Sequence, residues 1–171
     1  MLKAAMMGLC LTAGTAMAPQ AQAGQAYKRQ AFKTYVNERF GVTAGRPADW
    51  TPGNEPENGD GLRFTAPDGT AFVSISGSLQ AFGTVKEYLD IVAEEKGAQV
   101  TLEKRGPRSL VQSGVRGGVI FYKKSLLTCK DQVWNNLLIE YPAARKQAFD
   151  ALVAHVAGSL KGGRGYQVKC R

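Results

Sequence analysis

The fold is decided by residues 132–160, QVWNNLLIEYPAARKQAFDALVAHVAGSL. The first part, 132–141, carries apolar side chains on both of its faces, which is typical of a central strand that is covered on both sides. Pro142 suits the first turn of a helix, and an apolar stripe follows it, so we expect a helix over 143–160. A two-sided strand that leads into an amphipathic helix predicts a sheet with helices packed against it.

Upstream of this stretch, short strands and one helix are separated by turn signals. Thr84 and Glu87 have the spacing of a capping box, and Gly97 suits the end of a helix over 84–96. The order of strands, helix, strands and helix predicts a single α+β domain, with a mostly antiparallel sheet flanked by two main helices. The expected strands before the central one are 35–43, 62–65, 70–76, 99–104, 109–113 and 118–124.

The expected strand over 70–76 has two different faces. Ala71, Val73 and Ile75 alternate with Phe72, Ser74 and Ser76, so one face is apolar and the other carries mostly hydroxyl groups. Pro67-Asp68-Gly69 joins it to the preceding strand as a turn. Before that turn, Arg46-Pro47-Ala48-Asp49-Trp50 interrupts the first strand, and 52–61 is rich in Pro and Gly, which indicates a loop.

Two segments of the first half resemble known proteins. Phe40-Gly41-Val42 followed by Pro47-Ala48-Asp49-Trp50 resembles the opening of the Mog1/PsbP-like fold, and the element order over 39–160 is similar. The chain also resembles small uncharacterised exported bacterial proteins with a Tyr-Pro-Ala-Asp-Trp motif; Glu57-Asn58-Gly59-Asp60-Gly61 matches their second motif, whereas Gly45-Arg46 replaces the usual aromatic residue. The resemblance implies an α/β/α sandwich with a non-catalytic adaptor, assembly or binding role. It carries over no functional residues.

Residues 1–23 have the layout of a secretory signal peptide. Lys3 supplies the positive charge, 4–18 is apolar, and Ala21-Gln22-Ala23 places small residues where a signal peptidase reads. We expect cleavage after Ala23, which leaves a leader segment over 24–36 and a single domain over 37–171. No later apolar run reaches the length of a membrane span. The sequence therefore predicts a periplasmic or secreted protein with no transmembrane segment after cleavage.

Removal of the signal peptide would also remove Cys10 and leave Cys129 and Cys170. An even pair of cysteines in an exported chain indicates a disulfide. The bond would tie the glycine-rich C-terminal tail to the middle of the domain, and a loop of about 40 residues suggests ~3–4 kcal/mol of stabilisation from chain entropy. A reactive redox pair is the alternative, but the chain has no Cys-x-x-Cys spacing.

Charge is divided unevenly along the chain. The net charge of +8 separates into −3 over 24–103 and +10 over 104–171, with Lys3 in the signal peptide. Such asymmetry favours an anionic partner, and export argues against nucleic acid. An acidic protein or an anionic component of the cell envelope suits the compartment better, and a basic surface that only promotes solubility is the alternative. The candidate anion-binding residues are Lys104, Arg105, Arg108, Arg116, Lys123, Lys124 and Lys130.

Catalytic and metal-ligating patterns are weak. His155 is the only histidine, and it lies off the apolar stripe of the last expected helix, so we expect it to face solvent. Glu55, Glu57 and Asp60 cluster in the Pro/Gly loop, where little burial is available to raise the pKa of a carboxylic acid for glycoside hydrolysis. The same cluster suits a solvated turn or a cation, although its spacing matches no EF-hand. We expect no cofactor.

These patterns favour a non-enzymatic binding or accessory module of the bacterial cell envelope that contacts an anionic partner through its basic C-terminal half. One alternative is a hydrolase of an envelope polymer that uses the loop carboxylates. A second alternative is an immunity or inhibitor-like protein.

Overall fold

The structure is a computed structural model that describes residues 30–81, 83–168 and 170. The signal peptide predicted over 1–23 and residues 24–29 of the predicted leader lie outside the described residues. In chain order, the elements are β1 (Phe32–Val36), β2 (Thr43–Pro47), β3 (Thr51–Pro52), β4 (Gly61–Thr65), β5 (Phe72–Leu79), α2 (Val85–Ala93), β6 (Gln99–Gly106), β7 (Ser109–Arg116), β8 (Val119–Thr128), β9 (Val133–Pro142), the 3-10 turn η3 (Ala143–Arg145) and α3 (Lys146–Ser159).

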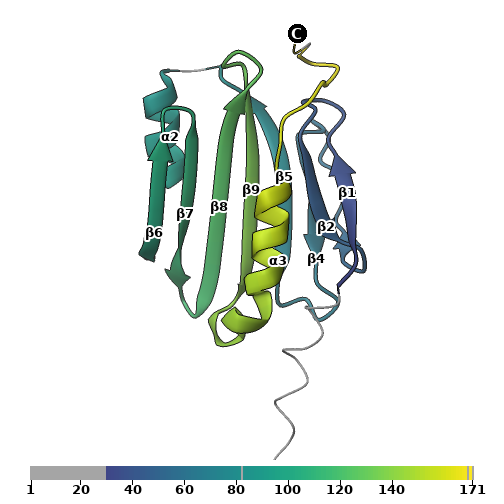
Figure 1. Ribbon diagram of the computed structural model, residues 1–171, viewed down its shortest axis with the longest axis vertical. Helices are drawn as coiled ribbons and strands as arrows, with labels where there is room; N and C mark the ends of the chain where they lie inside the picture. The colour runs from purple at the N-terminus through teal and green to yellow at the C-terminus, as the bar shows by residue number, and fades with distance from the viewer. Residues whose placement is uncertain (1–29, 82, 169, 171) are drawn as a thin grey trace, which may run out of the picture.

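A seven-stranded antiparallel sheet organises the molecule, in the order β3-β4-β5-β9-β8-β7-β6. β1 and β2 form a separate antiparallel pair, and β2 contacts both α3 and β5. In Figure 1, α3 lies in front of the middle of the sheet, while α2 lies at the β6–β7 side on the other face. Two helices on an antiparallel sheet confirm the predicted α+β class.

β9 is the central strand that the sequence predicted. It pairs with β5 on one side and with β8 on the other over its whole length. Leu137 and Ile139 pack in the core under α3, whereas Trp134 packs in the smaller core under α2. Since both faces of β9 are covered, its apolar residues do not follow a one-sided alternation.

The core on the α3 side is the larger of the two. Phe149, Leu152 and Val156 of α3 are fully buried, and the Phe149 ring stacks on Tyr141 of β9 at 4.6 Å between centroids. Trp50, from the Pro-Ala-Asp-Trp corner, packs edge-on against Phe149 at 6.5 Å. Burial of each such side chain stabilises the fold by about 1.5–3 kcal/mol.

The prediction of one strand over 35–43 is wrong, because the chain turns in the middle of this segment. β1 ends at Val36, and the amide of Phe40 donates a hydrogen bond to the side-chain oxygen of Asn37 (2.8 Å). Gly41 has a φ of +74°, and a Cβ there would lie 2.5 Å from the backbone of Gly163. The turn thus depends on a contact with the C-terminal tail, which local sequence patterns do not report.

Two neighbouring boundaries also differ from the prediction. Residues 43–47 continue as β2, although Arg46-Pro47 was expected to interrupt a strand; Pro47 is tolerated because it is the last residue of the strand, where it pairs with Phe32 of β1. β1 occupies the end of the segment expected to be a leader, so among the described residues secondary structure begins at Phe32. Within the described residues, no helix combines the length and apolarity needed to cross a membrane.

Candidate functional site

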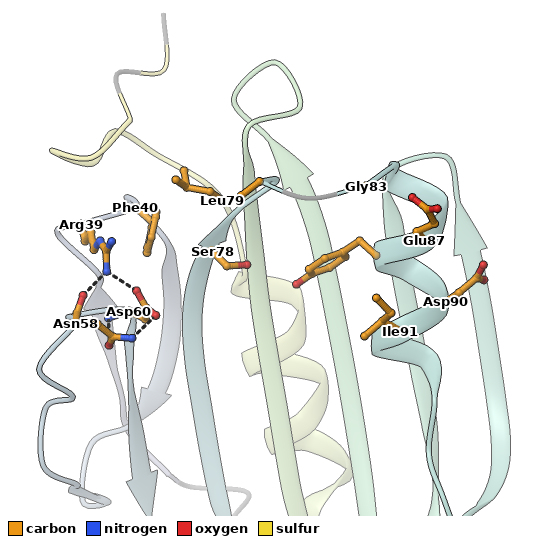
Figure 2. Close-up of a pocket in the computed structure, with 12 residues that line it drawn as sticks. Arg39, Phe40, Asn58, Asp60, Ser78, Leu79, Gly83, Glu87, Asp90 and Ile91 are labelled. Atoms are coloured by element: carbon orange, nitrogen blue, oxygen red, sulfur yellow. Dashed lines mark hydrogen bonds and ion pairs between the residues drawn. The ribbon is translucent and has the colours of Figure 1, made fainter.

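A groove runs along the α2 side of the sheet, between α2 and the corner formed by 39–40 and 58–60 (Figure 2). Its volume is about 990 Å³. A smaller cavity of about 410 Å³ shares Tyr88 and Ile91 with it and extends down the sheet. Because α2 lies to one side, the sheet face between α2 and β4 has no helical cover (Figure 2).

α2 forms one wall of the groove and is fixed at its first turn. The side chain of Thr84 accepts a hydrogen bond from the Glu87 amide (3.2 Å), and the Glu87 carboxylate accepts one from the Thr84 amide (2.6 Å), which confirms the predicted capping box. Tyr88 stacks on Trp134 with ring centroids 4.2 Å apart. Ile91 points into the groove and is 71% exposed.

The opposite wall is built from the turn after β1 and the loop before β4. Arg39 donates hydrogen bonds to the Asp60 carboxylate (2.7 Å) and to the Asn58 carbonyl oxygen. Phe40 is buried against Gly77 of β5, where an added Cβ would lie 2.5 Å from the Phe40 side chain. Asp60 is therefore neutralised by Arg39 and held at the rim of the groove.

The floor carries the hydroxyl groups expected from the alternation in β5. Ser74, Ser76 and Ser78 project to the α2 side, while Val73 and Ile75 are buried in the core on the α3 side. The floor is thus polar, whereas Leu79 and Ile91 supply apolar groups to the lining of the groove. A ligand in this groove would meet apolar walls above a hydroxyl-bearing floor.

Two carboxylates of α2 line the groove; Asp90 is paired with Lys86 and Arg105, whereas Glu87 has no basic ion-pair partner among the described residues. Hydrogen bonds to the backbone and side chain of Thr84 lower the pKa of Glu87 below its usual range. Hydrogen bonds from Lys86 and Arg105 lower the pKa of Asp90. Both groups are therefore ionised at neutral pH and accept hydrogen bonds rather than donate them.

The candidate anion-binding residues do not form one cluster of free cations. Arg105, Arg116 and Lys123 form ion pairs with carboxylates in or just after α2. Arg108 forms an ion pair that links the β6–β7 turn to the β8–β9 turn. Lys104, Lys124 and Lys130 have no carboxylate partner within the described part of the chain, and Lys124 donates instead to the Ala157 carbonyl oxygen (2.6 Å). The ion pairs are Arg105 with Asp90 and Glu103, Arg108 with Asp131, Arg116 with Glu95 and Glu140, and Lys123 with Glu95.

The residues weighed for catalysis are also dispersed. Glu55 and Glu57 are exposed on the loop before β4, and Asp60 is paired with Arg39. His155 is exposed, as expected, and stacks on Phe32 at 3.8 Å between ring centroids. Among the described residues, no group of three or more histidine, cysteine or acidic side chains has a geometry suited to a metal ion.

Cys129 and Cys170 are joined by a disulfide, with Cα atoms 4.9 Å apart. The bond closes a C-terminal strap, residues 162–170, over the turn after β1. The amides of Tyr166 and Gln167 donate to the carbonyl oxygens of Glu38 (3.0 Å) and Arg39 (2.9 Å). The strap therefore supports the wall of the groove that contains Arg39.

Local sequence patterns do not predict the groove. Its walls come from segments far apart in the chain, and no local pattern brings Arg39 beside α2. One signal was present: Ile91 lies off the apolar stripe of α2 formed by Val85, Tyr88, Leu89 and Val92, on the face expected to be solvated. Single exposed apolar side chains are common on protein surfaces, and Ile91 gains meaning because Leu79 lines the same groove.

No protein-family model matches the chain, and no curated protein matches it. Among solved structures, it is similar to the solution structure of cyanobacterial PsbP (CyanoP) from Synechocystis sp. PCC 6803. The TM-score is 0.55 at 12% sequence identity, over 91% of this chain and 98% of that chain. At this identity the likeness concerns the fold alone, and it confirms the predicted PsbP-like fold. The resemblance to exported bacterial proteins stays a prediction.

Proposed function

We propose that the chain is an exported, non-enzymatic binding module of the cell envelope, and that the groove beside α2 is its binding site. The observation that carries this proposal is the pair of large apolar side chains left in an open cavity. Ile91 is 71% exposed and Leu79 is 39% exposed, and both line the groove of about 990 Å³. Cavities of this size with apolar walls and few polar groups are typical of ligand and partner sites.

The chemistry of the groove indicates what it binds. Leu79 and Ile91 offer exposed apolar contacts, and the ionised Glu87 stands on the rim without a basic ion-pair partner among the described residues. We infer that the occupant is a segment of a partner protein that carries an apolar anchor next to a basic residue. Such a segment would bury the anchor between the walls and place its cation against the Glu87 carboxylate.

The same carboxylates favour binding over hydrolysis. A glycosidase needs one carboxylic acid that stays protonated until it donates its proton. Asp60 is instead paired with Arg39, and the pKa values of Glu87 and Asp90 are lowered by their hydrogen-bond donors. The groove thus lacks, among its described residues, a carboxyl group whose surroundings favour the protonated form.

Export is supported by two independent features. The first 23 residues have the layout of a signal peptide, and the cysteines that remain after cleavage are bonded to each other. A disulfide persists in the oxidising compartments that exported proteins enter.

A photo-crosslinking residue incorporated at position 91 tests the proposal in living cells. We expect one discrete adduct from position 91, and none from position 151, an exposed alanine on α3. The adduct should disappear when Leu79→Glu is added, because the charge would be buried in the apolar part of the groove. No adduct from position 91, or the same adducts from both positions, would contradict the proposal.

A further inference from the structure

The sheet face that carries α3 is covered over only part of its width. The main contacts of α3 are with β2, β9 and β8, and in Figure 1 no helix lies in front of β6 or β7. In layered domains, a sheet buries its apolar face against helices or another sheet. The side chains on this bare part of the sheet therefore indicate whether it is an ordinary solvated surface or a docking surface.

The strand register places one row of side chains on the bare face. Leu102 of β6, Ser113 of β7 and Tyr122 of β8 are direct partners, and the row ends at Ile139 in the core under α3. Directly paired residues project from the same face of a sheet, so all four point to the α3 side. Leu102 is 37% exposed, and Tyr122 is half-buried at the edge of the core.

The next row carries the charge. Lys104, Val111 and Lys124 are direct partners across β6, β7 and β8, and the row ends at Leu137 in the same core. Neither row contains a carboxylate. The Lys124 ammonium group donates to the Ala157 carbonyl oxygen, which is neutral, so its positive charge is not cancelled. The bare face is thus partly apolar, with one lysine on each side of Val111.

The bare face has room for one helix beside α3. Neighbouring strands lie about 4.8 Å apart, so β7 is about 10 Å from β9, which α3 contacts. Packed helices lie about 8–10 Å apart. A helix along β7 would therefore pack at an ordinary distance from α3, with Val111 beneath it and a lysine on each flank.

We propose that this bare face docks an amphipathic helix of a partner protein, whose apolar stripe is flanked on both sides by carboxylates. The stripe covers Leu102, Val111 and Tyr122, and the carboxylates pair with Lys104 and Lys124. A second copy of the chain does not suit the face, because two identical faces would oppose four lysines. This surface lies on the opposite side of the sheet from the groove, so the two proposals stand independently.

The test uses the full chain after signal cleavage and a fluorescent synthetic peptide. The peptide is an amphipathic helix with a leucine stripe flanked by glutamates; a matched peptide has lysines in place of the glutamates. We expect saturable binding of the glutamate peptide, measured by fluorescence anisotropy, and weakening by about tenfold in Lys104→Glu/Lys124→Glu. Lys33→Glu/Lys161→Glu makes the same charge change elsewhere and should leave binding unchanged.

If loss of the Lys124 hydrogen bond disturbs folding, Lys104→Glu alone keeps the test valid, because Lys104 is exposed and its side chain makes no hydrogen bond within the described residues. Thermal melting checks each variant. The proposal fails if the glutamate peptide does not bind, if both peptides bind alike, or if the Lys33/Lys161 control weakens binding equally. It also fails if lysine-dependent binding is found only for phosphatidylcholine vesicles that contain phosphatidylglycerol, which would assign the face to anionic lipid.

Discussion

The two helices are held on the sheet by different forces. Phe149, Leu152 and Val156 of α3 are fully buried, and the helix sits on the larger core. α2 buries only Leu89 and Ala93 within a small cluster. Three basic residues of the sheet add ion pairs to carboxylates in and just after α2; they are Arg105, Arg116 and Lys123.

This difference gives the two sides of the sheet different responses to solution conditions. Apolar burial is insensitive to moderate salt, whereas exposed ion pairs are screened. α3 should therefore unfold only with the whole domain, while α2 should open locally at a lower free energy. Since α2 forms a wall of the groove, the proposed binding site lies on the less stable side of the molecule.

The same substitution on each helix tests the comparison most strongly. Leu152→Ala should lower the free energy of unfolding by about 4–5 kcal/mol, because it opens a cavity in the larger core. Leu89→Ala should cost about 2–3 kcal/mol, because Leu89 keeps 6% exposure and its smaller surroundings can relax. Urea denaturation measures both values. Equal costs would mean that α2 and α3 are held by comparable burial.

The disulfide lies on the α3 side of the sheet, and its loss should have the next largest effect on stability. Replacing both Cys129 and Cys170 by serine should cost about 3–4 kcal/mol, because the bond spans 41 positions and restricts the unfolded chain. Wild-type protein unfolded in reductant should match the variant. Thiol labelling of the unfolded, unreduced wild type after signal cleavage should detect no free cysteine, and labelling of both residues would refute the bond.

On the α2 side, Glu95 is the residue whose loss should matter most among the ion pairs. It binds both Arg116 and Lys123, and its side chain is only 10% exposed. Glu95→Gln should cost about 1–2 kcal/mol and increase amide exchange in α2, because two cations lose their carboxylate. Glu94→Gln is the matched control, since Glu94 is 63% exposed and pairs with a lysine that is 89% exposed. A cost that is the same at low and high salt would argue against an electrostatic role.

The sequence predicted those parts of the fold that depend on local patterns. The two-sided apolar pattern predicted the central position of β9, the spacing of Thr84 and Glu87 predicted the capping box, and alternation in β5 predicted the hydroxyl floor. Each of these signals is complete within about ten residues. Capping boxes and period-two alternation are set by neighbouring side chains, so they survive without knowledge of the tertiary structure.

The sequence could not predict features that join distant segments. The turn at Gly41 depends on contact with Gly163, and the ion pair of Arg116 with Glu95 links the end of β7 to the segment that follows α2. A basic composition over 104–171 therefore overstated the free positive charge, because several of its cations are neutralised by acids from the first half of the chain. What remains uncancelled on the α3 side includes Lys104 and Lys124, and only strand register places those two together.

The smallest expected effect is a change in acid sensitivity at the start of α2. The pKa of Glu87 is lowered in the folded state by hydrogen bonds from Thr84, so the unfolded chain binds a proton there at higher pH than the folded chain does. The stability that the Glu87 carboxylate contributes is fully present above the ordinary carboxyl pKa of about 4. It is lost as the pH falls through the lowered pKa of the folded state. Stability should therefore decline as the solution is acidified.

Glu87→Gln isolates that contribution, because glutamine keeps the acceptor of the capping box but does not titrate. At neutral pH the variant should be nearly as stable as the wild type, and its stability should fall less between about pH 6 and about pH 3. Glu57→Gln, on the exposed loop, controls for the change in net charge. Urea denaturation across this range would contradict the assignment if both variants had the same pH dependence, because the carboxylate at the helix start would then be no better stabilised than one on a loop.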